Sequence, residues 1–125
     1  MHTASLIFEN EIRFGPAYYK LLIDKHLLEG RVFGGELKWH DSASIFAAEE
    51  WLTVDYNEGP ITRAVLFDLA EVRLSSFSTV TKGFVGDFRF ESDTFLYQKK
   101  YASSGIIQEM EVNISQISSW EHLTF

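Results

Sequence analysis

The residues with the clearest chemical potential are the carboxylates and aromatic rings between Trp39 and Thr62. This stretch contains no Lys or Arg. Carboxylates steer a basic partner and speed its association, and Trp and Tyr often anchor protein interfaces. The pattern therefore predicts a surface that binds a basic protein. The residues expected to form it are Asp41, Glu49, Glu50, Trp51, Asp55, Tyr56 and Glu58.

Catalytic and metal-binding patterns are weak in comparison. Of the four histidines, His40 is the one beside acidic and aromatic residues. An enzyme would need His40 and carboxylates to converge in a concave site, but Glu49 and Glu50 are neighbours, and neighbouring strand residues point to opposite faces. No serine lies in a nucleophile motif with supporting context. We therefore expect no enzyme activity, no metal site and no cofactor.

Two further features could bind an anion. Gly34-Gly35 is an isolated glycine pair with no following Lys, so it predicts a tight hairpin or a bulge rather than a phosphate loop. Arg31 and Arg63 could clamp a carboxylate or a phosphate, but such arginines more often pair with neighbours on a sheet surface.

Composition narrows the class of protein further. The chain has 125 residues, no cysteine and a formal net charge of -7. Disulfides and thiolate zinc sites are therefore impossible, and nucleic-acid binding is disfavoured because phosphate backbones repel acidic proteins. The N-terminus lacks a signal-peptide pattern, and no stretch approaches the ~20 apolar residues that span a bilayer. We expect a cytoplasmic protein that does not bind membranes.

The elements that position these residues are expected to be strands. Turn signals recur about every ten residues, including Gly15-Pro16 and Gly59-Pro60, and apolar residues alternate with polar ones between them. The pattern predicts one all-β domain over 1–125, an antiparallel β-sandwich or open barrel of about ten short strands. The expected strands are 5–9, 11–14, 18–24, 27–33, 35–39, 44–54, 62–69, 72–80, 84–90, 94–101 and 106–114.

The segment 43–52 is ambiguous. Its Ala and Glu content suits a helix capped by Asp41 or Ser42, but the following Thr53 and Val54 continue it as a strand, which we favour. As a strand, it places Glu50 on the inner face, where that residue needs a bulge, a partner or a role. The inward set would be Phe46, Ala48, Leu52 and Val54, and the outward set Ile45, Ala47, Glu49, Trp51 and Asp55.

Several segments, taken in order, resemble small bacterial proteins of toxin–immunity loci, of the contact-dependent inhibition or polymorphic toxin type. They are Glu11-Ile12-Arg13-Phe14-Gly15-Pro16, Gly30-Arg31-Val32-Phe33-Gly34, Trp39-x-Asp41-Ser42, Ala47-Ala48-Glu49-Glu50-Trp51-Leu52 and Gly59-Pro60-x-Thr62-Arg63. The resemblance implies an immunity protein that neutralises a cognate toxin domain, such as a nuclease, whose basic active site it would block. It assigns no binding residues. The alternative is a carbohydrate- or small-ligand-binding β-sandwich in which an exposed Trp51 or Trp39 stacks on a sugar ring.

Overall fold

The computed structural model describes residues 1–12, 15–55, 57 and 59–125, which form an almost wholly β structure. All strand pairs are antiparallel, as the alternation predicts. The strands are β1 (Ala4–Glu11), β2 (Ala17–Ile23), β3 (His26–Leu27), β4 (Val32–Trp39), β5 (Ile45–Thr53), β6 (Ile61–Asp68), β7 (Arg73–Ser76), β8 (Val80–Thr81), β9 (Gly83–Glu91), β10 (Thr94–Tyr101), β11 (Ile107–Asn113) and β12 (Glu121–His122).

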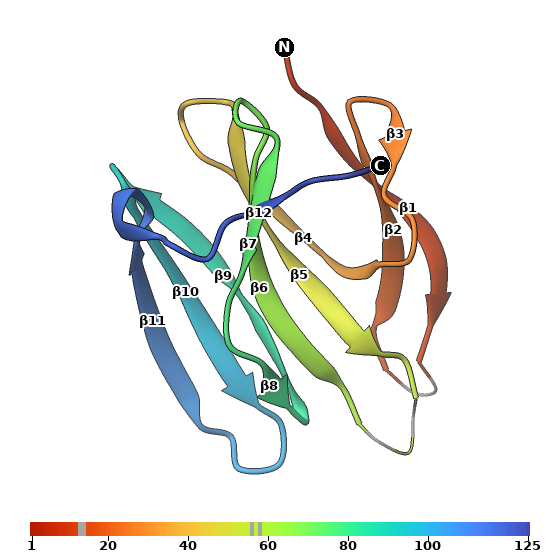
Figure 1. The fold of residues 1–125 in the computed structure, drawn as a ribbon. Coiled ribbons are helices and arrows are strands. Elements are labelled where there is room, and N and C mark those ends of the chain that lie inside the picture. The colour runs from red at the N-terminus through yellow and green to blue at the C-terminus, as the bar shows by residue number, and fades with distance from the viewer. Residues whose placement is uncertain (13–14, 56, 58) are drawn as a thin grey trace.

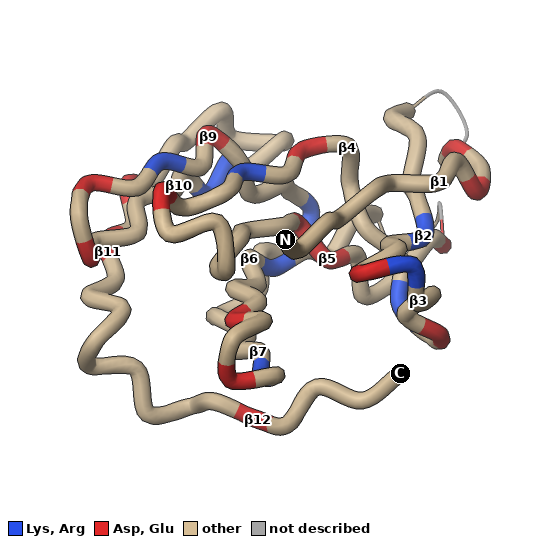
Figure 2. Tube along the Cα trace, turned by 90° about the horizontal axis from the view of Figure 1, so that it is seen from above, with Lys and Arg blue, Asp and Glu red and all other residues tan. Residues whose placement is uncertain are grey.

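The strands form two sheets (Figure 1). The large sheet has the order β1-β2-β4-β5-β6-β7-β12, with β3 on β2 and β8 on β6, and the small sheet has the order β11-β10-β9. Seen from above, the large sheet curls, and the C-terminal segment that contains β12 runs along its open side toward β3 (Figure 2). The ring of Phe125 lies 5.3 Å from that of His26, so this segment reaches the far side of the curl.

One hydrophobic core fills the curl of the large sheet. Its aromatic centre is Phe46 stacked on Phe67 at 4.8 Å, and Leu123 from the C-terminal segment is buried against it. The buried members are Leu21, Ile23, Leu28, Phe33, Phe46, Ala48, Val65, Phe67, Leu69, Leu74 and Leu123.

A second core lies between the two sheets. Two alanines and one leucine of β5 and β6 face aromatic side chains of β9 and β10, and large aromatic side chains dominate the energetics of such a layer. Its buried members are Ala47, Ala64, Leu66, Val80, Val85, Phe88, Phe95 and Tyr97. Both faces of β5 and β6 are therefore covered.

The segment 43–52, which the sequence left open between helix and strand, lies largely in β5, and both faces of this strand are buried. β5 is a strand, as favoured, and it lacks alternation because no face of it is wet over most of its length. The prediction that Ala47, Glu49 and Trp51 face solvent is wrong, because the small sheet covers that face. The prediction that Leu52 and Val54 point into the core is wrong too, because they are 42% and 43% exposed where the strand ends.

The predicted strand boundaries are confirmed for most of the chain, with local differences. The glycine pair forms a bulge within β4, where the register with β5 shifts between Phe33 and Leu37. The predicted strand 72–80 divides into β7 and β8, and 27–33 divides between β3 and β4. The 3-10 helix Ile114–Gln116 and β12 were not predicted. Residues 13–14 of the predicted strand 11–14 lie outside the described residues. Within the described part, no helix is long and apolar enough to cross a membrane.

Candidate functional site

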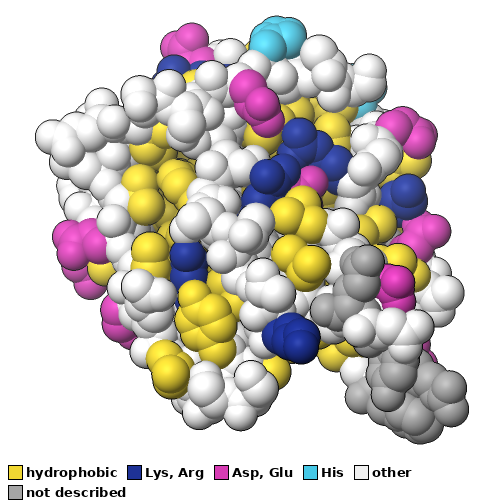
Figure 3. Space-filling view, turned by 60° about the horizontal axis from the view of Figure 1, so that its bottom comes forward, with side chains coloured by type: hydrophobic (Ala, Val, Ile, Leu, Met, Phe, Trp, Pro, Cys, Tyr) yellow, Lys and Arg dark blue, Asp and Glu magenta, His cyan; other side chains and the backbone are white. Residues whose placement is uncertain are grey.

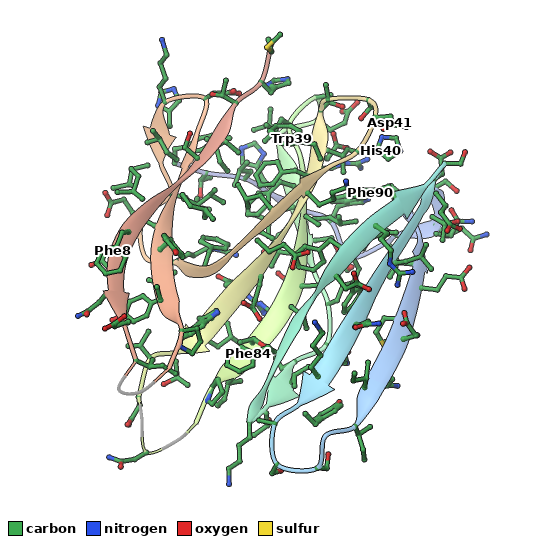
Figure 4. The ribbon with its side chains drawn as sticks, turned by 180° about the vertical axis from the view of Figure 1, so that it is seen from behind. Phe8, Trp39, His40, Asp41, Phe84 and Phe90 are labelled. Atoms are coloured by element: carbon green, nitrogen blue, oxygen red, sulfur yellow. The ribbon has the colours of Figure 1, made fainter. Side chains whose placement is uncertain are left out.

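The predicted acidic residues do not form one surface. Asp41 is exposed in the turn before β5, and Asp55 is exposed beyond its other end. A strand of this length spans about 30 Å, so the two carboxylates lie at opposite ends of the molecule. Figure 4 shows Asp41 beside His40 at the end opposite Phe84. The predicted site residues Tyr56 and Glu58 lie outside the described residues.

Glu50 is buried with two arginines as partners. It is 3% exposed, and its carboxylate accepts from Arg63 Nε at 2.8 Å and from Arg31 Nη1 at 3.2 Å. Arg31 also contacts the carboxylate of Glu121 at 3.5 Å. These arginines supply the partner that an inward-facing Glu50 requires. Glu50 is therefore buried in ion pairs and does not lie on the open acidic surface predicted for it.

Glu49 points to the other face of β5 and is also buried, at 7% exposed. Its Oε1 accepts from the Trp51 indole Nε1 at 3.0 Å, and its Oε2 accepts from the Val85 backbone N–H at 2.9 Å. Burial raises the pKa of Glu49 to about 7, although these two hydrogen bonds act to lower it. The negative charge of Glu36 raises it further, and the ammonium of Lys100 lowers it.

Glu36 and Glu49 together join the two sheets. β9 is an edge of the small sheet, and Glu36 on β4 accepts from its N–H groups at Asp87 (3.3 Å) and Phe88 (2.9 Å). Glu49 accepts from Val85 on the same strand. Carboxylates of the large sheet thus satisfy edge N–H groups of β9 that have no strand partner among the described residues.

A cleft of about 340 Å³ opens between the sheets at these carboxylates. We call it the seam cleft. Gly34 makes room for it, because a Cβ at this position would collide with Oε1 of Glu49. Its lining residues are Pro16, Ala17, Gly34, Gly35, Glu36, Glu49, Trp51, Phe84, Val85, Gly86 and Lys100.

A second hollow, of about 500 Å³, opens on the curled side where β5 ends, and we call it the mouth. Its exposed apolar residues are Leu52 and Val54, and Glu9 of β1 contributes a carboxylate. The space-filling view from this end shows hydrophobic side chains at the surface among basic and acidic ones (Figure 3). The mouth is lined by Glu9, Tyr18, Gly30, Arg31, Val32, Glu50, Trp51, Leu52, Thr53 and Val54.

Trp51 separates the two hollows. It lines both, and its ring lies 5.7 Å from that of Tyr18 and 5.8 Å from that of Phe84. At 3% exposed, it is a buried wall and not the open anchor that its position in the sequence suggests. Trp39, half-buried against Phe46 at 4.9 Å, presents no open stacking platform either.

His40 links two turns at the other end of the molecule. Its Nδ1 accepts from the Ser42 backbone N–H at 3.0 Å, so Nε2 carries the proton and donates to the Ser92 carbonyl at 2.7 Å. The rings of His40 and Phe90 pack in a T-shaped arrangement with their centroids 5.2 Å apart (Figure 4). Within residues 1–12, 15–55, 57 and 59–125, no three His, Asp or Glu side chains gather closely enough to hold a metal ion.

Sequence reasoning missed Glu36, Phe84 and Lys100 as members of a site. Alternation alone assigns Glu36 and Lys100 to solvent, and nothing local indicates that these residues of β4 and β10 line one cleft. The available signal was the Gly34-Gly35 pair, since glycine within a strand often marks a close approach.

No protein-family model matches the chain, and searches of curated proteins and of solved structures also gave no match.

Proposed function

We propose that this protein binds and neutralises a basic protein, as an immunity protein acting on a cognate bacterial toxin domain, and that the mouth is its contact surface. The observation that carries the proposal is the pair of exposed aliphatic side chains, Leu52 and Val54, beside the exposed carboxylates of Glu9 and Asp55. Exposed apolar groups rimmed by charge are typical of protein interaction sites.

The surface continues from the mouth onto the edge strand β1. Glu9 belongs to both, and the preceding residues Ile7 and Phe8 are 46% and 62% exposed. Figure 4 shows Phe8 on this flank of the molecule. β1 pairs with β2 on one side only, so its outer side can accept hydrogen bonds from a partner chain.

The charge of this region favours a basic partner. Glu9, Glu11 and Asp55 are exposed, whereas the nearby Arg31 and Arg63 are paired with Glu50. Carboxylates on a protein surface can imitate phosphates in the basic cleft of a nuclease, and they raise the rate of association. A nuclease toxin domain met in the bacterial cytoplasm fits this chemistry.

The test is co-expression with the product of the adjacent gene as the candidate toxin. We expect the wild-type chain to co-purify with it and to restore cell growth. The combined substitution Glu9→Lys and Asp55→Lys should weaken binding at least tenfold, with a smaller loss at high salt, because both carboxylates act on the encounter with a basic surface.

Asp41→Lys is the control at the far end of β5, and it makes the same charge change as either lower-end substitution alone. It should leave binding and protection unchanged. Absence of binding by the wild-type chain would contradict the proposed function. If Asp41→Lys weakens binding as much as the combined Glu9→Lys and Asp55→Lys substitution does, the assignment of the contact surface to the mouth is wrong.

A further inference from the structure

We infer that the seam cleft binds a guanidinium group, presented by an arginine side chain of the basic partner. The inference rests on the proposed function for the source of the group, but the cleft and its chemistry are independent of the mouth. Two carboxylates on neighbouring strands, Glu36 and Glu49, line a hollow whose aromatic walls include Trp51 and Phe84.

The carboxylates have acceptor capacity left for such a group. In the described part of the chain, each oxygen of Glu36 and Glu49 accepts one hydrogen bond from an N–H group. A carboxylate oxygen can accept two hydrogen bonds. A guanidinium carries five N–H donors in one plane, so it can use the remaining acceptors of both carboxylates together.

The walls suit a flat cation. The half-buried Phe84 lines the cleft and packs against the buried Trp51 with their ring centroids 5.8 Å apart, and phenyl rings attract guanidinium groups. Gly34, Gly35 and Gly86 line part of the cleft without side chains, beside Pro16, Ala17 and Val85. A Cβ at Gly86 would lie 3.2 Å from Oε1 of Glu36, so a larger residue would crowd the acceptor.

The charge balance of the cleft also favours a cation. With both acids ionised, Glu36 and Glu49 carry two negative charges, and the exposed Lys100 at the rim supplies one positive charge. An anion would meet two carboxylates. A sugar hydroxyl would bind a buried carboxylate without compensating its charge, whereas the positive charge of a guanidinium offsets part of the desolvation cost of ionised Glu49.

Binding should release a proton near neutral pH. The charged groups that act on Glu49 are Glu36 from β4 and Lys100 from β10, while β9 and β5 present the N–H groups of Val85 and Trp51. Because burial raises the pKa of Glu49 to about 7, a fraction of the molecules hold it protonated at that pH. An entering guanidinium favours the ionised form and expels that proton.

The first experiment uses the wild-type chain and two small probes, N-acetylarginine methylamide and its neutral isostere N-acetylcitrulline methylamide. In NMR titrations at pH 7, the arginine probe should shift the Trp51 indole N–H and the Val85 amide resonances, and the citrulline probe should not. Calorimetry in buffers of different ionisation enthalpy should show proton release. Equal responses to both probes, or an unmoved Trp51 indole resonance, would overturn the inference.

Variants then test the residues. Glu49→Gln and Glu36→Gln should each weaken the arginine probe at least tenfold, whereas Lys100→Gln, which removes a competing cation, should strengthen it about threefold. Their folding is checked by the dispersion of amide resonances. Unchanged affinity in a folded Glu49→Gln variant would contradict the assignment even if the probe binds.

The source of the guanidinium is tested with the toxin domain. Glu49→Gln should weaken the complex at pH 7.5, and Asp41→Asn should not. If the arginine probe binds but Glu49→Gln leaves the affinity for the toxin domain unchanged, the guanidinium does not come from the partner protein. The cleft then binds a free guanidinium compound. If no toxin binds the wild-type chain, the proposed function fails while the probe titration still decides the chemistry of the cleft.

Discussion

Glu49 and Glu50 are adjacent in the chain, both are buried, and they serve opposite faces of β5 in different ways. Glu50 faces the curl, where two guanidinium groups compensate its charge. Glu49 faces the seam, where its direct donors are an uncharged indole and a backbone N–H. The two carboxylates are therefore buried to a similar extent, but positively charged groups neutralise only the charge of Glu50. The comparison indicates that Glu50 stabilises the fold through ion pairs with two arginines. Glu49 has no such ion pair, so a positively charged ligand can still pair with its carboxylate.

The largest expected effect is the loss of the compensated carboxylate. Glu50→Ala leaves Arg31 and Arg63 without their shared partner, and breaking such a buried pair costs about 4 kcal/mol, a value that allows for the quarter of each arginine side chain that is exposed. Urea unfolding at pH 7 measures the free energy of unfolding. A loss below about 1 kcal/mol would show that water hydrates the two guanidinium groups once the carboxylate is removed. The ion pairs of Glu50 would then contribute little to stability, contrary to the contrast drawn with Glu49.

The second effect concerns pH and Glu49. Folding raises the pKa of this group from 4.5 to about 7, so the protonated form stabilises the fold. This contribution is complete below pH 4.5 and is lost as the pH rises to about 7, a change of about 3 kcal/mol in the free energy of unfolding.

The difference between wild type and Glu49→Gln isolates this effect, because other carboxylates titrate alike in both proteins. From pH 4.5 to 7.5, the wild-type protein should lose stability relative to the variant. Parallel stability curves for the two proteins over that range would contradict the raised pKa.

A smaller effect is expected from Gly34→Ala. The added Cβ would collide with Oε1 of Glu49 and displace the carboxylate from the Trp51 indole, and overpacking of this kind costs about 2 kcal/mol. Gly35→Ala is the matched control, because its Cβ would meet the Tyr19 ring at 3.3 Å, a contact that a small ring movement relieves. Thermal unfolding of both variants measures the difference. Equal losses would show that the position of Glu49 is not the cause.

The smallest effect is expected at Glu121. This residue contacts Arg31 at 3.5 Å, but its side chain is 58% exposed, so the pair is screened by water. Glu121→Gln should cost less than about 1 kcal/mol at physiological salt, as exposed ion pairs do. A loss as large as that of Glu50→Ala would mean that the C-terminal segment, and not the buried carboxylate, holds Arg31 in place.

The strands could be predicted because alternation and turn chemistry are local. β9 and β10, each with one face against the second core, follow the predicted ranges closely. The position of β12 could not be predicted, because its two residues form a strand only where they meet β7. The environment of β5 also could not be predicted from local sequence. A strand covered on both faces carries no alternating pattern, so the second covered face leaves no signal.

The candidate site was predicted less well than the fold. The sequence singled out Glu49 and Trp51, which line the seam cleft, and Asp55, which directly follows Val54 of the mouth in the chain. It could not show that a second sheet would cover Glu49 and Trp51, because that contact joins β5 to strands more than thirty residues away. The acidic residues that are close in the sequence therefore do not form one acidic surface, because Glu49 and Glu50 are buried.

The two cores share their walls, since β5 and β6 present side chains to both. Neither core can open without exposing strands on which the other depends, so the protein should unfold as one cooperative unit. The amide hydrogens of these two strands should then exchange with solvent only through global unfolding, while those of β1 and β11 at the sheet edges exchange by local fraying. A guanidinium bound at the seam would slow exchange in β9 and leave β1 unaffected.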